Sequence, residues 1–523
     1  MRKVEELKAI AEQISTLARI AEIPVEQREP VVIAEERAYS LLGTMQWRQN
    51  DLAGAEHSFD HALSLRSSGG LMIRRSVLLP RVLPSRPGIL AARENVRARL
   101  SALAQAPPVP ADAVTDVAWT LFLLAYHGEH DNLSLHRLFH KVCSRADPKL
   151  DWTAPHCLRP RRPGRPRVGF ISWHFREHTI SRLFMGMLRA FDSAAFDVSV
   201  FSFQGQDDVL ASAFLPGKRR ISLLPNLVAA QQAIASEDLD VLLYLDLGMD
   251  FLTLFLAHAR LARRQGVLWG HPDTTGLESI DLFFSPDCME PTDGESHYGE
   301  RLIRLPGPTV VYARPLPPRS LLSRRSLGLP QHAPLYLCPQ TPFKFHPDFD
   351  RVLVQILQAV PASHLVLAAG KDTETMALVK SRMTGFSPEV ADRIHILGPL
   401  SHAEFVHLFQ LCDLTLDPLH YSGGNTSLEA FANGTPIVTW PGKFMRARHT
   451  AGFYRLMGIA DAVARDHDHY IELAIHLGTD ANARSELRAR IRTASAILYD
   501  NEDGVRAIEN LIREDVSKED IAT

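Results

Sequence analysis

The stretch DPLHYSGGNTSLEAFANGTPIVTWPGK, residues 417–443, decides the fold of this chain. It follows an apolar run and passes through the paired glycines Gly423-Gly424, which favour a tight turn. Three good N-cap residues come next, so a helix is expected to begin among them and to continue to residue 431. Asn433-Gly434 ends that helix, and the apolar run 437–440 predicts a buried strand. The stretch therefore has the pattern strand, glycine turn, helix, turn, strand.

A helix that begins behind a glycine turn can bind phosphate. Its free backbone N–H groups and the positive end of its dipole point at one place. Glu429 lies about one turn into the helix, where its carboxylate can accept hydrogen bonds from two hydroxyls of a ribose. The spacing is neither that of a Walker loop nor G-x-G-x-x-G. Taken alone, the stretch is also compatible with an ordinary helix N-cap in an α/β protein.

Length and composition limit the class of protein. A chain of 523 residues is too long for one core and suits two or three domains. A net charge of -3 provides no basic surface for nucleic acid. The five scattered cysteines, without a CxxC pair, favour a reducing compartment and argue against a disulfide framework or a zinc site. The chain shows neither a signal peptide nor a membrane-spanning run, so we expect a cytoplasmic protein without a membrane or nucleic-acid partner.

The first 150 or so residues have helical patterns. The segment 38–65 has small and large residues at the spacing of one tetratricopeptide repeat, although a generic helical hairpin is the alternative. Further helices are expected at 91–104, 112–128 and 132–145, the second of them buried nearly all round. The proline- and arginine-rich connector 157–167 marks the clearest domain boundary.

After the connector, strands alternate with helices, which is typical of a parallel sheet. A second proline-rich hinge covers 314–325, and the alternation then restarts. The predicted domains are a helical tetratricopeptide-like domain (1–155), two Rossmann-like halves (165–313 and 326–485) and C-terminal helices (486–523). The predicted strands are 167–172, 196–203, 241–245, 266–269 and 280–284 in the first half, then 335–338, 364–369, 393–397, 413–416 and 437–440 in the second.

Two Rossmann-like halves in tandem face each other across a cleft, and ligands bind at the strand ends that line it. The predicted fold is therefore α/β with GT-B architecture, preceded by an all-α domain. Three loops follow strands at this cleft: 172–183 with two histidines, 270–276, and 338–348 with Lys344. Transfer of a group from a nucleotide sugar needs a cation or helix N-terminus for the leaving diphosphate and a histidine near the acceptor.

The same loops resemble those of the O-linked N-acetylglucosamine transferase and SPINDLY-type family (glycosyltransferase family 41), especially its bacterial members. The similar segments are RVGFISWHFREHTISRL, WGHPDTTG, QTPFKFHPD, GPLSHAEF and GGNTSLEAFANGTPIVTWPG. They occur in the family's order between roughly residues 112 and 500.

The resemblance implies roles for individual residues. His178 and Lys344 are the catalytic candidates, with His178 as an acceptor-side base or orienting group, or alternatively a hydrogen-bonding group for the donor. Donor-binding candidates are Gln340, Lys344, Leu400, His402, Gly424, Asn425, Thr426, Ser427 and Glu429. Candidates for the acceptor or sugar pocket are His174, which is more readily explained as structural, His271, Pro272, Thr274 and Thr275.

The resemblance also implies an inverting, metal-free reaction without a cofactor. Asp238-Leu-Asp240 has the form of a D-x-D metal motif, but it directly precedes a strand and is interpreted as a polar loop. The charged residues Arg446, Arg448 and His449 are interpreted either as phosphate ligands or as a solvated helix face.

The chain differs from the animal enzymes of this family at several site positions. It has Gly424-Asn425-Thr426 in place of His-Thr-Thr, Glu429 in place of aspartate, and Phe343 in place of the tyrosine before the lysine. These differences leave the sugar and the base open among UDP-GlcNAc, UDP-glucose and GDP-fucose, with UDP-GlcNAc as the first choice.

The predicted function is transfer of one sugar to Ser/Thr side chains of a protein acceptor that the helical domain helps to bind. The alternatives are a protein N-glucosyltransferase, an O-fucosyltransferase, a sugar-nucleotide 2-epimerase and a non-catalytic repeat scaffold.

Overall fold

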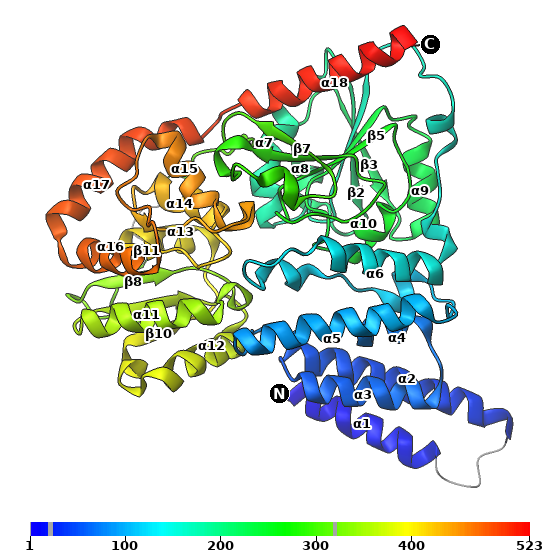
Figure 1. Ribbon diagram of the computed structural model, residues 1–523, viewed down its shortest axis with the longest axis horizontal. Coiled ribbons are helices and arrows are strands. Elements are labelled where there is room, and N and C mark those ends of the chain that lie inside the picture. The colour runs from blue at the N-terminus through cyan, green and yellow to red at the C-terminus, as the bar shows by residue number, and fades with distance from the viewer. Residues whose placement is uncertain (1, 19–24, 317–321, 523) are drawn as a thin grey trace. The chain divides into compact units, whose positions relative to one another are not determined.

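A computed structural model describes residues 2–18, 25–316 and 322–522 of the chain. The chain divides into two compact units. The first comprises residues up to 124 together with 134–151, and the second comprises 125–133 together with the chain from residue 152 onwards. Figure 1 shows the elements of both units.

The first unit is helical and contains the predicted hairpin. Helices α2 (Val25–Arg48) and α3 (Leu52–Leu65) pack against each other, and Asp51 caps α3 by accepting the Gly54 N–H at 2.9 Å. Phe59 is fully buried, and a Cβ at Gly43 would lie 2.7 Å from its ring, so a small residue is needed where the helices touch. The other helices are α1 (Arg2–Ala18), α4 (Gly69–Ser76), α5 (Arg86–Gln105) and α6 (Leu133–Ala146).

Residues 112–128 do not form the predicted buried helix. They form a π-helical turn, Ala113–Val117, and a 3-10 turn, Phe122–Tyr126. The first turn ends at Ala118, whose φ of 45° lies in the left-handed region, so the chain leaves the right-handed helical conformation there. The apolar run correctly indicated burial, but burial on all sides is also compatible with irregular chain, so periodicity could not distinguish the two.

The second unit contains two parallel sheets. The larger has seven strands in the order β3-β2-β1-β4-β5-β6-β7. Helix α7 (Thr179–Ala190) connects β1 to β2, as a right-handed crossover in a Rossmann-like sheet would. The strands are β1 (Arg167–Ile171), β2 (Asp197–Phe203), β3 (Lys218–Leu223), β4 (Val241–Tyr244), β5 (Arg264–Leu268), β6 (Leu282–Pro286) and β7 (Arg301–Leu305). Helices α8 (Asp208–Ser212), α9 (Leu227–Ala235) and α10 (Phe251–Leu256) complete this half.

The smaller sheet has the order β10-β9-β8-β11-β12, with β8, the first strand of this half, at its centre. In Figure 1, α11 and α12 lie on one side of this sheet and α13 and α14 on the other. The strands are β8 (Leu335–Cys338), β9 (His364–Ala368), β10 (Ile394–Leu397), β11 (Leu414–Leu416) and β12 (Ile437–Val438). The helices are α11 (Pro347–Ala359), α12 (Thr373–Phe386), α13 (His402–Leu411), α14 (Asn425–Ala432), α15 (His449–Met457), α16 (His467–Thr479) and α17 (Ala481–Ala494).

Two strands of the larger sheet were not predicted. Strand β3 lies at one edge of the sheet and exposes Arg219, Arg220 and Ser222, so it lacks the continuous apolar run of a central strand. Strand β7 lies at the other edge and alternates arginine with apolar residues. In the smaller sheet, β12 is shorter than the predicted strand 437–440.

The last helix, α18 (Asp503–Ala522), returns to the first Rossmann-like half. Glu509 on this helix is buried, and its carboxylate accepts the backbone N–H of Asp192 at 2.7 Å. Arg506 donates to the Ala190 carbonyl at the end of α7 at 3.0 Å. The C-terminal helix therefore links the end of the second half to the first.

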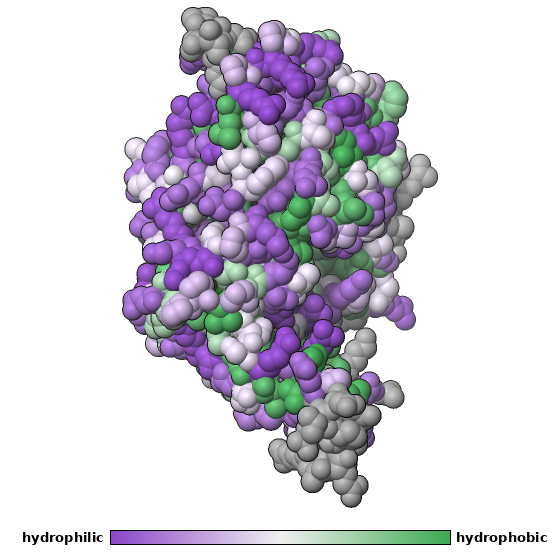
Figure 2. All heavy atoms as spheres, turned by 90° about the vertical axis from the view of Figure 1, so that its right-hand side faces the viewer, coloured by the Kyte–Doolittle hydropathy of each residue, from purple (hydrophilic) through white to green (hydrophobic). Residues whose placement is uncertain are grey.

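Among the described residues, no helix is both long enough and apolar enough to span a membrane. On the face shown in Figure 2, hydrophobic residues lie in small groups among hydrophilic ones.

We predict that Gly186→Ala destabilises the second unit. A Cβ at this position of α7 would lie 1.8 Å from the Val311 carbonyl oxygen, so the helix or the 310–312 segment must shift. Overpacking of this kind costs about 1–3 kcal/mol. Differential scanning calorimetry of the full chain should show a lower unfolding temperature.

The matched control is Gly385→Ala in α12, where a new Cβ meets no atom within 4 Å. Here alanine should stabilise by about 0.5–1 kcal/mol, because glycine is a poor helix former. Equal effects of the two substitutions would contradict the close contact between α7 and Val311.

Candidate functional site

The glycine turn after β11 is organised by a buried carboxylate, that of Asp417. One carboxylate oxygen accepts the Gly423 N–H at 2.8 Å, and the other accepts the Ser422 hydroxyl at 2.6 Å and the Thr439 hydroxyl at 2.8 Å. Burial raises the pKa of Asp417, and these hydrogen bonds oppose that shift. The Asp417 carboxylate thus fixes the position of the glycine turn through these hydrogen bonds.

Helix α14 begins directly after this turn. Its N-cap is Gly424, which has no side chain, whereas the predicted N-cap residues lie inside the first turn. No side chain of the described residues caps the helix start, so its first N–H groups are not used by a local cap. The hydroxyl of Ser427 is buried and pairs with Thr450 at 2.7 Å, while Asn425 and Thr426 are half-buried.

The loop after β8 meets the start of α14 through three side chains. Lys344 donates from Nζ to Gln340 Oε1 at 2.8 Å, and Gln340 Nε2 donates to Thr426 Oγ1 at 2.7 Å. The structure therefore brings together the predicted phosphate residues of two loops that lie more than 80 positions apart.

Lys344 is half-buried, and its ammonium group is largely removed from water. Burial lowers its pKa to about 8, against the opposing effect of the nearby Asp417 carboxylate. Its Nζ lies 4.8 Å from the centre of the Tyr421 ring, within the range of a cation–π interaction. A weakly hydrated cation beside a helix N-terminus is a suitable site for a multiply charged anion.

Glu429 lies at the predicted position in α14 and is buried. Its Oε1 lies 2.7 Å from Nε2 of His402 and 3.5 Å from the hydroxyl of Tyr312. His402 begins α13, where Ser401 and Glu404 form a capping box, and Leu400 before it is half-buried. The structure thus places His402 beside the predicted ribose ligand.

The histidines of the loop after β1 stack on each other with ring centroids 4.3 Å apart. His174 is buried, and its Nδ1 lies 2.6 Å from Asp246. Burial lowers the pKa of His174, but the hydrogen bond to Asp246 and the negative charges of Asp246 and Asp250 together outweigh this effect and raise the pKa overall. His178 caps α7 by accepting the Ile180 N–H at Nδ1. Burial and the neighbouring positive charges lower the pKa of His178 to about 3, so its ring is neutral with the proton on Nε2.

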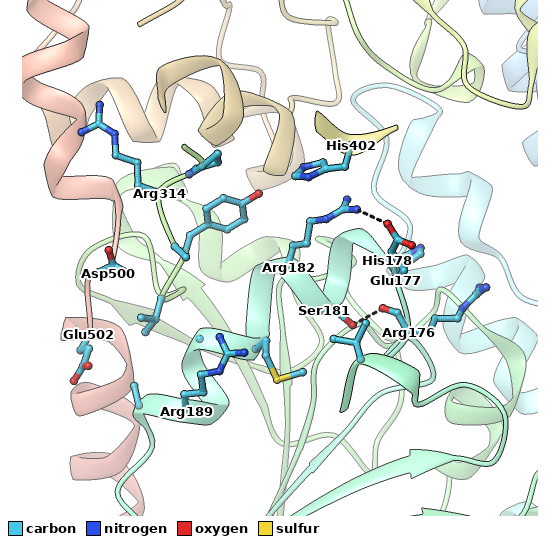
Figure 3. Close-up of a pocket in the computed structure, with 18 residues that line it drawn as sticks. Arg176, Glu177, His178, Ser181, Arg182, Arg189, Arg314, His402, Asp500 and Glu502 are labelled. Carbon is cyan, nitrogen blue, oxygen red and sulfur yellow. Dashed lines mark hydrogen bonds and ion pairs between the residues drawn. The ribbon is translucent and has the colours of Figure 1, made fainter. Parts of the chain in front are cut away.

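His178 and His402 line one pocket of about 720 Å³. Figure 3 shows Arg176, Arg182, Arg189 and Arg314 among its lining residues, with Arg182 paired to Glu177 at 3.6 Å. The pocket thus lies between α7 of the first half and His402 of the second half, the histidine that contacts Glu429.

The loop 270–276 is buried except for Gly270, which is half-buried. Thr274 and Thr275 both donate their hydroxyls to Glu300, and the Thr275 N–H also reaches this carboxylate at 2.7 Å. A Cβ at Gly248 would lie 2.9 Å from the ring of His271, so a glycine is needed for the close approach of these loops. Pro272 is buried beside it. The two threonines therefore hold the loop in place through Glu300.

Asp238 and Asp240 form ion pairs and contacts that support the first sheet. Asp240 is buried, accepts the Arg167 N–H at 2.8 Å and lies 3.2 Å from Arg161. Asp238 has a φ of 49° and pairs with Arg162 at 2.7 Å. These contacts agree with the interpretation of the motif as a polar loop that enters a strand.

Sequence reasoning missed the role of Arg446. The interpretation as a solvated helix face was wrong, because the side chain is buried and pairs with Asp273 at 3.1 Å. It also donates to the carbonyls of Gly128 and His130. Asp273 accepts in addition from Asn132 at 2.6 Å. The ion pair joins the two Rossmann-like halves, and no local pattern signals a contact between residues 173 positions apart.

His449 is also buried. It packs against Trp269 with ring centroids 5.3 Å apart, and burial lowers its pKa to about 3. A Cβ at Gly424 would lie 3.7 Å from the Trp269 ring, so an aromatic residue from the first half borders the helix start in the second.

Two Rossmann-like sheets with their site loops brought together define the GT-B class, the fold of nucleotide-sugar glycosyltransferases. Residues 316–503 match the family model described as Glycosyl transferase family 41. A solved structure of an O-GlcNAc transferase mutant from Thermobaculum terrenum is similar over 100% of both chains, with a TM-score of 0.72 and 21% identity. This structure confirms the fold class.

Curated relatives are similar in sequence as well. A protein of Solanum lycopersicum named "Probable UDP-N-acetylglucosamine--peptide N-acetylglucosaminyltransferase SPINDLY" is 25% identical over 67% of this chain and 39% of its own length. Its Arabidopsis thaliana counterpart of the same name is 25% identical over 64% of this chain and 37% of its own length. The chain thus spans about two fifths of these relatives. Together with the family model, these matches confirm the resemblance to the O-linked N-acetylglucosamine transferase and SPINDLY family.

We predict that Arg446→Met destabilises the second unit by about 3–5 kcal/mol, because it leaves Asp273 as a buried charge without its cation. Adding Asp273→Asn to this variant should recover part of the loss, since the remaining amide is neutral. Urea unfolding of the two single variants and the double variant measures the coupling. Additive effects would show that the pair does not hold the halves together.

Proposed function

We propose that this protein is an inverting glycosyltransferase that moves a single sugar from a nucleotide sugar to Ser/Thr side chains of protein acceptors. UDP-N-acetylglucosamine is the proposed donor, because the names of the SPINDLY relatives state this donor. The observation that carries the proposal is the chain of contacts from Lys344 through Gln340 to Thr426 at the start of α14.

The leaving diphosphate would be stabilised by this cluster. Negative charge grows on the diphosphate as the bond to the sugar breaks, and a buried ammonium and a helix N-terminus stabilise that charge strongly. Lys344, the amide of Gln340 and the N–H groups of residues 425 and 426 provide these groups without a metal ion. We assign Lys344 as the principal cation of the reaction.

The nucleoside would lie along α13 and α14. Glu429 accepts hydrogen bonds, and its contact with His402 holds the carboxylate in one orientation. Two ribose hydroxyls are suitable donors to such a carboxylate. We assign Leu400 and His402 to the region around the base.

His178 would act as a positioning group at the sugar or the acceptor. Its neutral ring with a proton on Nε2 is a hydrogen-bond donor, and a pKa of about 3 makes it a weak base. This supports the orienting role among the alternatives for His178. The acceptor would approach through the pocket that His178 lines, and the helical unit with its tetratricopeptide-like hairpin would help to bind the acceptor protein.

We predict that Lys344→Met weakens UDP binding and abolishes sugar transfer to protein. The substitution removes the cation but keeps an unbranched apolar stem of similar length. Binding is measured by thermal shift: a ligand at about 100 times its Kd adds roughly 2.7 kcal/mol of apparent stability. Transfer is measured as mass added to Ser/Thr of a mixed acceptor-peptide library supplied with UDP-N-acetylglucosamine.

The control is Lys443→Met, a nearby lysine whose ammonium packs over Phe444 at 5.3 Å. It should bind UDP like the unchanged protein. A lack of stabilisation by UDP, GDP or dTDP in the unchanged protein would overturn the proposal in favour of a non-catalytic scaffold. Conversion of the nucleotide sugar without an acceptor would identify an epimerase.

We predict that donor affinity falls as pH rises through about 8. Below that pH the Lys344 ammonium is charged and attracts the diphosphate, and above it the group loses its charge. Isothermal titration with UDP-N-acetylglucosamine between pH 6.5 and 9 should show a Kd that is constant at first and then rises. Binding should also take up protons near pH 8, because the diphosphate raises the pKa of the lysine.

The profile should disappear in Lys344→Arg, since guanidinium stays charged over this range. The same inflection in Lys344→Met would assign the titration to another group.

A further inference from the structure

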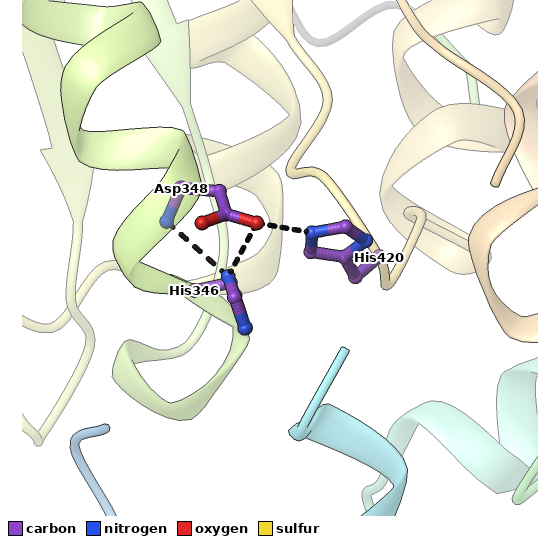
Figure 4. A group of neighbouring side chains, drawn as sticks. All are labelled: His346, Asp348 and His420. Carbon is purple, nitrogen blue, oxygen red and sulfur yellow. Dashed lines mark hydrogen bonds and ion pairs between the residues drawn. The ribbon is translucent and has the colours of Figure 1, made fainter. Parts of the chain in front are cut away.

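A cluster of metal-binding side chains lies beside the proposed diphosphate site. His346 and Asp348 stand at the start of α11, and His420 follows β11 in the loop before the glycine turn (Figure 4). One potential ligand atom from each residue lies within 4.8 Å of the others. Within the described part of the chain, this is the one group of three or more such residues.

We propose that these three residues bind a divalent transition-metal ion, with Zn²⁺ as the best match. Two imidazoles and one carboxylate are a usual ligand set for Zn²⁺, which commonly keeps a water molecule in the fourth position. The cysteine pattern in the sequence argued against a zinc site, but this cluster contains no cysteine.

The distances in the cluster resemble those around a bound ion. Asp348 Oδ2 lies 2.9 Å from His420 Nε2 and 3.3 Å from His346 Nδ1. Two ligand atoms that are each about 2.0–2.1 Å from one ion are separated by about 2.9–3.4 Å at angles between square and tetrahedral. One carboxylate oxygen is thus already at ligand spacing from both imidazoles, and the ligand atoms of all three residues lie within 4.8 Å of one another.

The tautomer of His346 suits a metal ligand. Its Nδ1 is unprotonated and accepts the backbone N–H of Asp348 at 3.2 Å, and an ion would replace this hydrogen bond at the same lone pair. The two rings meet edge to face with centroids 4.5 Å apart, which keeps both nitrogens directed at the carboxylate. His346 is buried, while Asp348 and His420 are half-buried, so an ion can enter from solvent.

Glu129 lies on the outer side of His420, where metal-binding histidines generally have a hydrogen-bond partner. Its Oε1 lies 4.0 Å from Nδ1 of His420, the ring nitrogen that does not face Asp348, which is beyond hydrogen-bond distance. The same oxygen accepts the Lys443 N–H at 2.8 Å. A shift of this carboxylate toward the ring on metal binding would orient the imidazole and make it a stronger ligand.

The backbone at His420 also supports a site. Its φ of 69° lies in the left-handed region, which asparagine, aspartate and histidine enter more often than other residues with a side chain. In this conformation the ring of His420 lies with Nε2 2.9 Å from Asp348.

An ion at this place would join the two loops of the proposed diphosphate site. His346 follows Lys344 by two residues, and His420 precedes Ser422 by two. The ion would act on the positions of these loops, and we assign it no part in the transfer chemistry. This inference stands on the cluster alone and does not depend on the proposed glycosyltransferase activity.

The test is metal binding by the untagged full-length chain after treatment with a chelator and its removal. Titration with Co²⁺ should give one equivalent bound, with the visible absorption of a four- or five-coordinate ion and without thiolate charge-transfer bands. Zn²⁺ should displace the Co²⁺ and raise the Tm. Strong thiolate bands would show that the cysteines bind the ion instead, and this would overturn the proposal.

Two variants remove a ligand with little change of shape. His420→Asn suits the left-handed backbone, and Asp348→Asn is isosteric; each should weaken metal binding by about 100-fold, and Glu129→Gln by about tenfold. The matched control is His395→Asn, which breaks another close histidine pair, His364 and His395, whose nitrogens lie 2.9 Å apart.

The control should bind Co²⁺ with unchanged affinity and stoichiometry. Circular dichroism confirms that each variant is folded. Equal Co²⁺ affinity in the unchanged protein, His420→Asn and Asp348→Asn would overturn the proposal, as would a loss of affinity in His395→Asn alone. Because the readout is metal binding, its failure is distinct from a failure of the donor-binding experiments.

Discussion

The candidate site depends on the buried carboxylate of Asp417. A carboxylate without water around it is costly, and it remains in the interior here because two hydroxyls and one backbone N–H donate to it. Those donors belong to the glycine turn and to the residue after β12, so the charge fixes where the turn lies relative to the sheet. Helix α14 starts from that turn, and its N–H groups therefore point in a fixed direction. The same negative charge faces the ammonium of Lys344 and partly offsets the effect of burial on its pKa.

The two Rossmann-like halves are held together by specific pairs rather than by a shared sheet. Arg446 reaches Asp273 across the halves, and Trp269 borders the start of α14 while donating to Thr309 at 2.6 Å. Both contacts come from loops at the strand ends where ligands bind in this fold. The same loops therefore join the two halves and border the proposed donor site, so a substitution that disturbs the contact between the halves is expected to disturb the site as well. This explains why so many polar groups near the cleft are buried and engaged with protein partners.

Much of the fold could be predicted because its strands and helices have strong local patterns. Strand β8 coincides with its predicted range because four consecutive apolar residues in a central parallel strand leave no ambiguity. Edge strand β3 was missed because half of it faces solvent, and residues 112–128 were wrongly predicted as helix because composition alone does not show how a buried segment satisfies its backbone. At the site, Gln340, Lys344 and Thr426 were found through motifs that keep fixed spacings within loops. Arg446 was misjudged because charge suggests exposure, and its partner is distant in sequence.

The surroundings of the half-buried Lys344 suit its proposed role in holding a diphosphate. An ammonium in water would lose much of its attraction to the anion through hydration, whereas a desolvated one interacts at full strength. Desolvation also brings its pKa near neutrality, so the charge must be maintained by neighbours. Asp417 and the face of Tyr421 do this without forming a direct ion pair that would compete with the ligand. The bound anion would then complete the charge balance, which makes the cluster more stable when a diphosphate is present than when it is absent. Such a site would bind its ligand tightly, because the ion pair with Lys344 forms only when the anion is bound.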